Sequence, residues 1–344
     1  MGDCLATAAR GPLDPAAEVR ALTAPPAPDG NVPRGGTGLA ALVDQAAAFL
    51  LQARAENTRR AYASDWKDFE CWCAERQVLA CPAAPSTVAL YLTALAATHK
   101  VATLTRRLSA ISLAHHTAGF PSPTEDVGVR GLMAGIRRSR GTAATAKRPL
   151  LVPDLQALLA TLPDNLLGLR DRALLLLGFS GAFRRSELVS LNVEDVLETS
   201  DGLVLTLRRS KVDQEAVGRA VAIPRGREAA TCAVQALARW REAAGITRGP
   251  LFVRVNRHRQ ILPQRLSGEA VALVVKRYAA AAGFDPKEFA GHSLRAGLAT
   301  AAAIAGKSER AIMNQTGHKS TTTLRRYIRD ANLFRDNAAE GIGL

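Results

Sequence analysis

The chain has 344 residues, and its 45 Lys and Arg against 31 Asp and Glu give a formal net charge of +14. This length favours two domains, each with its own core, and the excess of cations predicts an anionic partner, most often nucleic acid. The alternative is a basic protein whose charges only face solvent. The five cysteines form no repeated framework and no zinc-ligand spacing, which excludes a disulfide-stapled secreted domain and predicts reduced thiols in the cytoplasm.

The N-terminal stretch 1–38 is rich in Ala, Pro and Gly, and we expect a disordered tail. It contains no apolar run with a cleavage pattern, so it is not predicted to be a signal peptide or a membrane anchor. The most continuous apolar run of the chain, Ala173 to Phe179, is far shorter than the roughly 20 residues that span a bilayer. The sequence therefore predicts a protein without membrane contact.

Residues 39–140 have the periodicity of a small helical bundle of four to five helices. Apolar residues at 62, 66, 69 and 73 recur with helical spacing and form one stripe. Similar stripes predict helices that bury Val88 to Leu95, Leu104 to Ile111 and Val129 to Ile136, with short connections between them.

Basic residues of three stretches are candidates for contact with DNA phosphates. They lie off the apolar stripes of the last two helices, in the segment 141–149 that has the composition of a basic linker, and in a loop near residue 257. Since any exposed helix face tends to be charged, a solvated surface remains the alternative. The candidates are Arg106, Arg107, Arg137, Arg138, Arg140, Lys147, Arg148, Arg254 and Arg257.

The second domain, 150–330, is predicted to be mainly α-helical with a small antiparallel β-sheet. Pro153-Asp154 opens a helix, and the apolar run from Ala173 reads as a buried core helix that ends at Gly181. Asp201-Gly202 is a tight-turn signal between two strands. The predicted strands are Val193–Val196, Leu203–Leu207 and Ala220–Ile223, and further helices are predicted at 226–244 and 267–283.

Arg184 follows the end of the core helix and precedes a new helix start at Ser186. This places it in a turn at a helix N-terminus, where backbone amides also favour an anion. The next cluster of cations, from Arg208 to Lys211, lies in the charged loop between the second and third strands. The Arg184 turn is a candidate for binding an anion, whereas the cations of the loop could also be ordinary solvated side chains.

Four residues near the C-terminus suggest a reaction centre. His292 and Arg295 are three apart, so on a helix they share one face and can converge on a small anion. His318 follows a glycine at a helix boundary, and Tyr327 comes nine residues later on another helix. A tyrosine is a poor nucleophile at its ordinary pKa of about 10, but it becomes useful where cations hold an anionic electrophile against it.

This pattern of His-x-x-Arg, Gly-His and Tyr resembles the catalytic C-terminus of the tyrosine recombinases, also called the phage integrase family. The stretch from Ser180 to Leu188 resembles the first catalytic box of that family, with Ser180 in place of the usual threonine. The helices before it resemble the family's core-binding domain, a bundle of the SAM-like class that contacts DNA. The resemblance thus covers both predicted domains and is most specific at the C-terminus.

The resemblance implies a set of catalytic residues and a reaction. It assigns the nucleophile to Tyr327 and a supporting role to Glu187, and it places the family's catalytic lysine at Lys211 on the β-hairpin. The implied reaction is site-specific recombination through a 3′-phosphotyrosyl intermediate, with no metal, ATP or other cofactor. The full implied catalytic set is Arg184, Lys211, His292, Arg295, His318 and Tyr327.

The resemblance also implies binding partners and a cellular location. The substrate would be double-stranded DNA with inverted-repeat sites, bound by a homo-tetramer in the synaptic complex and by a chain that is monomeric when free. The tail 331–344 would dock in trans on a neighbouring protomer, and the protein would be cytoplasmic and associated with the nucleoid.

Two other functions stay open at this point. A type IB topoisomerase uses nearly the same residues to nick, swivel and reseal DNA without exchanging strands between sites. A DNA-binding protein that has lost catalysis is the second alternative, although every matched position carries a chemically competent residue type.

Overall fold

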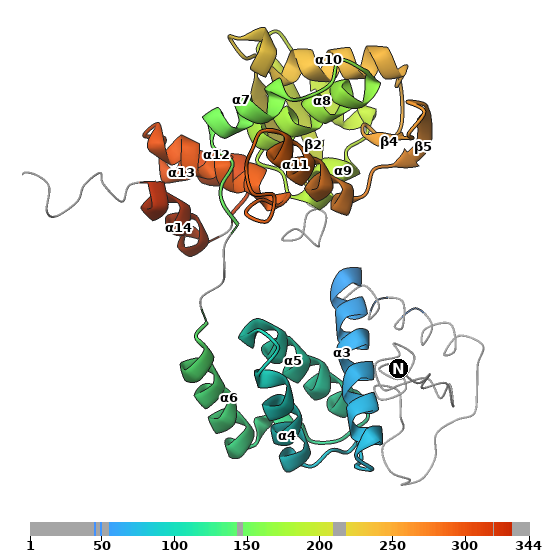
Figure 1. Cartoon of the computed structure of the whole chain (residues 1–344), viewed down its shortest axis with the longest axis vertical. Coiled ribbons are helices and arrows are strands. Elements are labelled where there is room, and N and C mark those ends of the chain that lie inside the picture. The colour runs from blue at the N-terminus through green and yellow to red at the C-terminus, as the bar shows by residue number, and fades with distance from the viewer. Residues whose placement is uncertain are drawn as a thin grey trace, which may run out of the picture. The chain divides into compact units, whose positions relative to one another are not determined.

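The structure is a computed structural model that describes residues 45, 49, 55–142, 147–208, 218–318 and 320–331. The chain divides between Ala144 and Thr145 into two compact units, here called the first unit and the second unit, and each is described by itself. Helices dominate both, and the second also holds small antiparallel sheets (Figure 1). Within the described ranges, no helix combines the length and the apolar character needed to cross a membrane.

The helices of the first unit are α3 (Glu56–Glu75), α4 (Pro85–Ala96), α5 (Val101–Thr117) and α6 (Val127–Arg140), with a short 3-10 turn at Pro123–Glu125. Local signals explain where they start. Proline occupies the first turn of α4, and the carboxylate of Asp126 accepts the backbone N–H groups of Gly128 and Val129 at the start of α6. The predicted apolar stripes are confirmed, since they supply the buried core of the unit.

Arg107 is the exception among the predicted surface residues of α5. Only 8% of it is exposed, and its guanidinium group bonds the carboxylate of Asp68 and the hydroxyl of Tyr91. The prediction that it lies opposite the apolar stripe is wrong, because residue 107 is three positions after the buried Leu104 and shares its face. Its neighbour Arg106 is half-exposed and binds Asp65 through two hydrogen bonds of 2.7 and 2.9 Å.

The second unit is built around α8 (Leu166–Ser180), which confirms the predicted core helix with its end at Gly181. α8 is apolar on all sides, and it buries the charged pair of Arg170 and Asp171 with it. The Asp171 carboxylate, fully buried, also accepts the hydroxyl of Tyr278 at 2.9 Å. The other helices are α7 (Val152–Ala160), α9 (Arg185–Ser190), α10 (Ala233–Ala244), α11 (Gly268–Ala281), α12 (His292–Ile304), α13 (Glu309–Thr316) and α14 (Thr321–Ala331).

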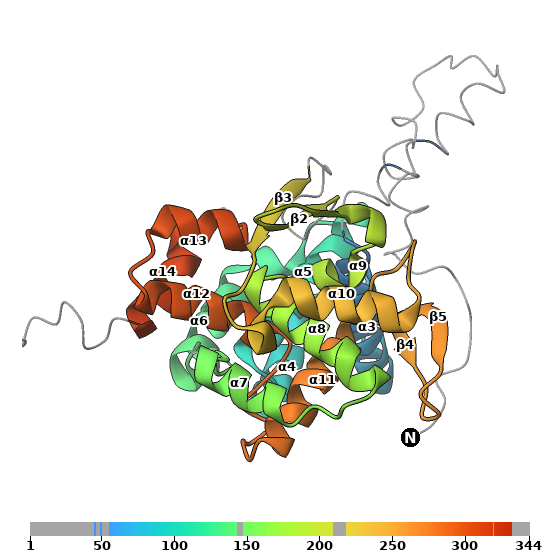
Figure 2. The ribbon, with the colours of Figure 1, turned by 90° about the horizontal axis from the view of Figure 1, so that it is seen from above.

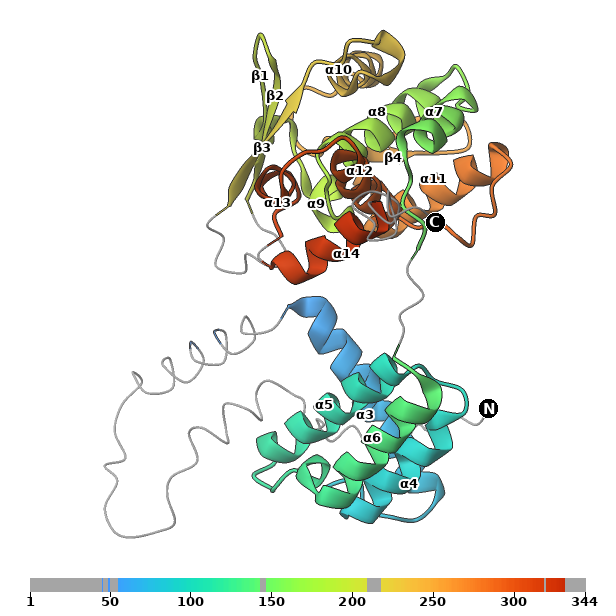
Figure 3. The same ribbon diagram turned by 90° about the vertical axis from the view of Figure 1, so that its left-hand side faces the viewer.

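A three-stranded antiparallel sheet stands at one side of the second unit, next to α10 and α13 (Figure 3). Its strands run in the order β1 (Val196–Glu198), β2 (Gly202–Leu207) and β3 (Arg219–Pro224). The predicted Asp201-Gly202 turn is confirmed between β1 and β2, and only glycine fits there, since a Cβ on Gly202 would come within 2.1 Å of the Ile223 carbonyl oxygen.

Two predicted boundaries in the second unit differ from the structure, and one hairpin was missed. Residues 193–195 form a 3-10 turn and not a strand, because the Asp195 carboxylate accepts the backbone N–H of Asn192. The helix predicted from residue 226 begins at Ala233, after a 3-10 turn at Ala229–Thr231. The hairpin of β4 (Val253–Val255) and β5 (Ile261–Arg265) was not predicted, and Arg254 lies in its first strand and not in a loop.

The second unit begins before the predicted Leu150. The backbone N–H of Arg148 donates to the Glu288 carbonyl at 2.9 Å, and that of Leu150 donates to Ser293 at 3.0 Å. The Arg148 side chain also binds Asp154 at 2.9 Å. Residues 147–149, expected in the linker, therefore lie against this unit, while 143–146 of that linker and the predicted tail 1–38 fall outside the described residues.

Gly297 allows this entry segment to touch α12. A Cβ at this position would lie 1.9 Å from the carbonyl oxygen of Leu150, a backbone atom that cannot swing away. We expect Gly297→Ala to lower the free energy of unfolding of the second unit by roughly 2 kcal/mol or more, through overpacking. Thermal melting of the variant and of the wild type measures this loss of stability.

Gly131→Ala is the matched control, because Gly131 also lies within a helix but has nothing within 4 Å of an added Cβ. Here alanine should stabilise α6 by about 0.5 to 1 kcal/mol, since it is the better helix former. Equal effects of the two substitutions would contradict the close approach at Gly297.

Candidate active site

α12 places two of the predicted residues, His292 and Arg295, on adjacent turns. Arg295 is 1% exposed, and its Nη1 donates to the Ala182 carbonyl at 2.8 Å. Its Nη2 is buried and has no hydrogen-bond partner among the described residues. Burial and the nearby charge of Arg184 lower the pKa of Arg295 to about 10, so it stays a cation at neutral pH. Arg295 therefore keeps donor capacity for an anion.

Arg184 lies where the sequence predicts, at the turn before α9. The start of this helix is already paired with a carboxylate of the protein itself, that of Glu187. The carboxylate of Glu187 accepts the backbone N–H of Arg184 at 2.9 Å and its Nη1 at 2.5 Å. Glu187 is 1% exposed, so this pairing keeps a buried charge compensated. The two contacts fix the orientation of the Arg184 guanidinium group.

His318 follows the left-handed Gly317 that ends α13. The Thr316 hydroxyl donates to the Ile312 carbonyl at 2.7 Å, so its oxygen accepts from His318 Nδ1, also at 2.7 Å. In the neutral ring this leaves Nε2 with its lone pair. Burial and the charges of Arg295 and Arg184 lower the pKa of His318 to about 4.

Tyr327 reaches this cluster from α14 of the same chain. Leu324, fully buried one turn earlier, packs with Ala299 of α12 and Ile312 of α13 and seats the helix. The Tyr327 hydroxyl lies 2.8 Å from His292 Nε2, and its ring centroid is 6.2 Å from that of His318. Partial desolvation, together with Arg295 and Arg184, lowers the pKa of His292, which favours a neutral ring able to accept the phenolic proton.

Arg219, at the start of β3, belongs to the same cluster and was not predicted. Its Nη2 lies 3.8 Å from Glu187, and its charge acts on both Arg295 and His318. Nothing in the sequence singles it out, since it is one of many arginines and belongs to no motif. Its nearness to the site follows from the pairing of β2 with β3 and from the position of α13 beside that sheet.

The match to a family model decides what kind of protein carries this cluster. The model of the phage integrase family matches residues 150–333, which span the whole cluster. The chain belongs to the phage integrase family. It is 46% identical over 294 residues to the integrase/recombinase xerD homolog of Selenomonas ruminantium, covering 84% of this chain and 86% of that protein. It is 26% identical over 300 residues to the recombinase cre of Escherichia phage P1, with 81% and 85% covered.

Solved structures show that the fold is that of the integrase family as well. A XerH site-specific recombinase in a post-cleavage complex with a palindromic difH substrate superposes with a TM-score of 0.60 at 14% identity, covering 95% of this chain and 96% of that one. A lambda integrase dimer bound to a COC′ core site gives a TM-score of 0.53 at 20% identity, with 87% and 98% covered.

The other candidate residues fall into three groups. Lys211 falls in 209–217, outside the described residues. Arg254 and Arg257 belong to the β4–β5 hairpin, on the opposite side of the second unit from α13 and α14 (Figures 1 and 2). Arg137 and Arg138 are exposed at the end of α6, whereas Arg140, Lys147 and Arg148 already bind protein groups.

His318 should make the stability of this integrase-family unit depend on pH. The unfolded ring takes up a proton near pH 6.5, whereas the folded ring resists until about pH 4. Between these values the folded state binds fewer protons, so acid favours unfolding, and the stabilisation present above pH 6.5 is lost as the pH falls. We expect His318→Gln to reduce the slope of unfolding free energy against pH in this window, measured by calorimetry in anion-poor buffer.

His258→Gln is the control, since His258 is exposed in the β4–β5 turn. If the His318 variant kept the wild-type slope, the ring would not be held neutral by its neighbours.

Proposed function

We propose that this chain is a site-specific DNA recombinase that cuts and rejoins duplex DNA through a covalent link to Tyr327. The observation that carries the proposal is the Tyr327 hydroxyl, held 2.8 Å from a histidine nitrogen beside two largely buried arginines. A phosphodiester is the electrophile that such a cationic setting suits, because its non-bridging oxygens accept charge-assisted hydrogen bonds.

The chemistry can be assigned to residues of this chain. Arg184 and Arg295 hold the non-bridging oxygens, and the Tyr327 oxygen attacks phosphorus in line. His292 Nε2 takes the phenolic proton as the new P–O bond forms. The bond from phosphorus to the 5′ oxygen breaks, and the products are a 3′-phosphotyrosyl link and a 5′-hydroxyl. His318 can add a hydrogen bond to the phosphate once the anion raises its pKa and Nε2 gains a proton.

The leaving 5′ oxygen also needs a proton, and we assign this task to Lys211 as general acid, by its place on the family's β-hairpin. Because the phosphate ester is conserved in the tyrosyl link, a second 5′-hydroxyl can reverse the step and join a new strand. The proposed cycle therefore needs no ATP and no metal.

The partners follow from the relatives as proposals. The XerH and lambda integrase structures are complexes with DNA sites, and the palindromic difH site supports an inverted-repeat substrate for this chain too. We propose that the first unit is the core-binding domain and that 150–330 is the catalytic domain. We also propose that the tail 331–344, of which 332–344 lie outside the described residues, docks on a neighbour in a tetrameric synaptic complex. We further propose that the protein acts in the cytoplasm, associated with the nucleoid, since its proposed substrate is DNA.

Tyr327→Phe tests the nucleophile. We expect it to abolish the covalent protein–DNA adduct on a nicked suicide duplex while DNA binding persists, since only the attacking oxygen is removed. Gel electrophoresis under denaturing conditions measures the adduct. Tyr62→Phe, a change of the same kind on α3 of the first unit, is the control and should leave adduct formation intact.

Two assays, plasmid relaxation and adduct formation, separate the alternative functions. Relaxation of a plasmid without paired sites, and without recombinants, would point to a type IB topoisomerase. Lack of an adduct between the wild-type protein and any suicide duplex would leave a DNA-binding protein without catalysis.

Lys211→Ala tests the general acid. The variant should cleave an ordinary duplex about 100-fold or more slowly. A duplex with sulfur at the bridging 5′ position should restore the rate, because a thiolate with a pKa of about 8.5 leaves without a proton. If the sulfur substrate were cleaved just as slowly, Lys211 would act on another step.

A further inference from the structure

The position of His318 depends on the last turn of α13. This turn ends at Thr316, and Gly317 then adopts a left-handed conformation with φ 66° and ψ 38°. His318 is the next residue, and its Nδ1 binds the Thr316 hydroxyl. Whatever fixes the end of α13 therefore also fixes the imidazole ring.

Arg219 binds the carbonyl groups at this helix end. Its Nη1 donates to Asn314 at 3.3 Å and to Gln315 at 3.1 Å, and its Nη2 donates to Thr316 at 3.4 Å. The last carbonyls of a helix lack partners within the helix and carry the negative end of its dipole. One planar guanidinium group serves three of them, which the point charge of a lysine cannot reproduce.

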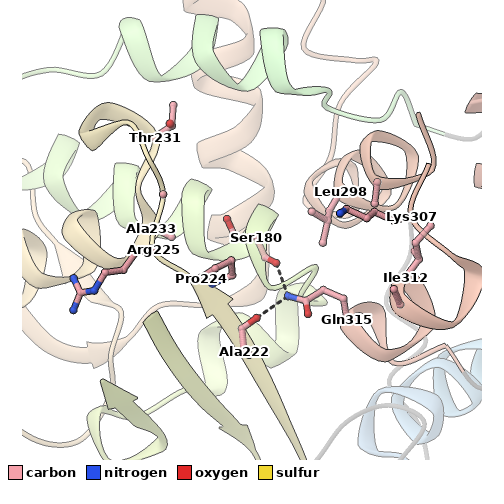
Figure 4. Close-up of a pocket in the computed structure, with 13 residues that line it drawn as sticks. Ser180, Ala222, Pro224, Arg225, Thr231, Ala233, Leu298, Lys307, Ile312 and Gln315 are labelled. Atoms are coloured by element: carbon pink, nitrogen blue, oxygen red, sulfur yellow. Dashed lines mark hydrogen bonds between the residues drawn. The ribbon is translucent and has the colours of Figure 1, made fainter. Parts of the chain in front are cut away.

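Gln315 fixes the same turn from the opposite direction. Its side-chain Nε2 donates to the carbonyl oxygens of Ser180 at 2.7 Å and Ala222 at 3.1 Å (Figure 4). Ser180 ends α8, and Ala222 lies in the middle of β3. The amide thus ties α13 to the core helix and to the strand that carries Arg219.

The contact between Arg219 and the turn is close. A Cβ on Gly317 would come within 2.8 Å of the Arg219 guanidinium carbon, so the cation lies directly against the residue before His318. Arg219 is 22% exposed, and its terminal nitrogens face backbone carbonyls and Glu187. Its terminal nitrogens are therefore engaged with protein groups.

We propose that Arg219 and Gln315 form a clamp on the C-terminal turn of α13, and that this clamp positions His318 for the transition state. The proposal rests on the proposed recombinase function of the same site. Both members are positioning residues, because they act through the backbone that carries His318. The positive charge of Arg219 also contributes to the low pKa of that histidine.

The test measures the rate of adduct formation on a suicide duplex in a single turnover, together with DNA affinity. Arg219→Gln and Gln315→Ala should each slow the reaction by about tenfold to a hundredfold, as expected for a displaced catalytic group. DNA affinity should stay within about threefold, because binding of the ground state is not altered. Arg219→Lys should recover little of the rate.

A double-mutant cycle with His318→Ala separates positioning from an independent contact. In that background, either clamp substitution should change the rate by less than about twofold, since the group that it positions is gone. Arg225→Gln is the matched control: Arg225 follows β3 and binds Glu198 at 2.8 Å and the Ser200 carbonyl at 3.1 Å. Arg225→Gln should form the adduct at the wild-type rate.

Two outcomes would overturn the clamp. The first is a wild-type rate of adduct formation for Arg219→Gln. The second is a clamp substitution that slows the His318→Ala variant by the same factor as it slows the wild type. If Arg219→Gln does not fold, Gln315→Ala decides by the same criteria, because it leaves every charge of the site in place. A wild-type protein that formed no adduct would instead refute the proposed function.

Discussion

A single buried carboxylate organises the positive charge of this site. Glu187 accepts both the backbone N–H and the side chain of Arg184, and Arg219 lies 3.8 Å from it. A buried ion needs partners of opposite sign, so the carboxylate fixes the two guanidinium groups around itself. Arg295 stands close by with no carboxylate bonded to it among the described residues, which leaves the cluster with a net positive charge.

That surplus of charge sets the state of the other reacting groups. Together with burial, which is the larger cause, it lowers the pKa of both histidines and so favours neutral rings that can exchange a proton with an oxygen. The surplus positive charge also makes the surroundings of the Tyr327 hydroxyl suitable for a phosphate, whose negative charge would neutralise it. The geometry depends on apolar packing as well, since the buried Leu324 holds α14 against α12 and α13.

The sequence singles out most of the residues that the structure brings together, but not every residue that surrounds them. His292, Arg295, His318 and Tyr327 carry helical spacing and a turn glycine, and the structure brings them together with Arg184. Arg219 could not be found this way, because its place depends on strand pairing and on a contact more than 90 residues away in the chain. Arg107 was misplaced although its spacing from Leu104 puts it on the buried face of α5, and the positions of Asp68 and Tyr91 explain how a cation is accommodated there.

The helices and strands also differ in how well the sequence predicts them. Apolar periodicity locates the helices of both units. The β4–β5 hairpin was missed because the alternation of β4 covers only Val253 to Val255 and because Pro263 interrupts β5. The start of β1 depends on a local cap by Asp195 that propensity alone does not predict. Such boundaries are set by single hydrogen bonds, which a pattern of residue types does not contain.

The way in which the chain enters the second unit has a practical consequence. Residues 148 and 150 are hydrogen-bonded to Glu288 and Ser293, and Gly297 lets the Leu150 backbone lie directly on the helix that carries His292 and Arg295. A chimaera that joins a foreign domain to this second unit must therefore make its junction upstream of Lys147. A junction placed at Leu150 would remove part of the scaffold beneath His292 and Arg295.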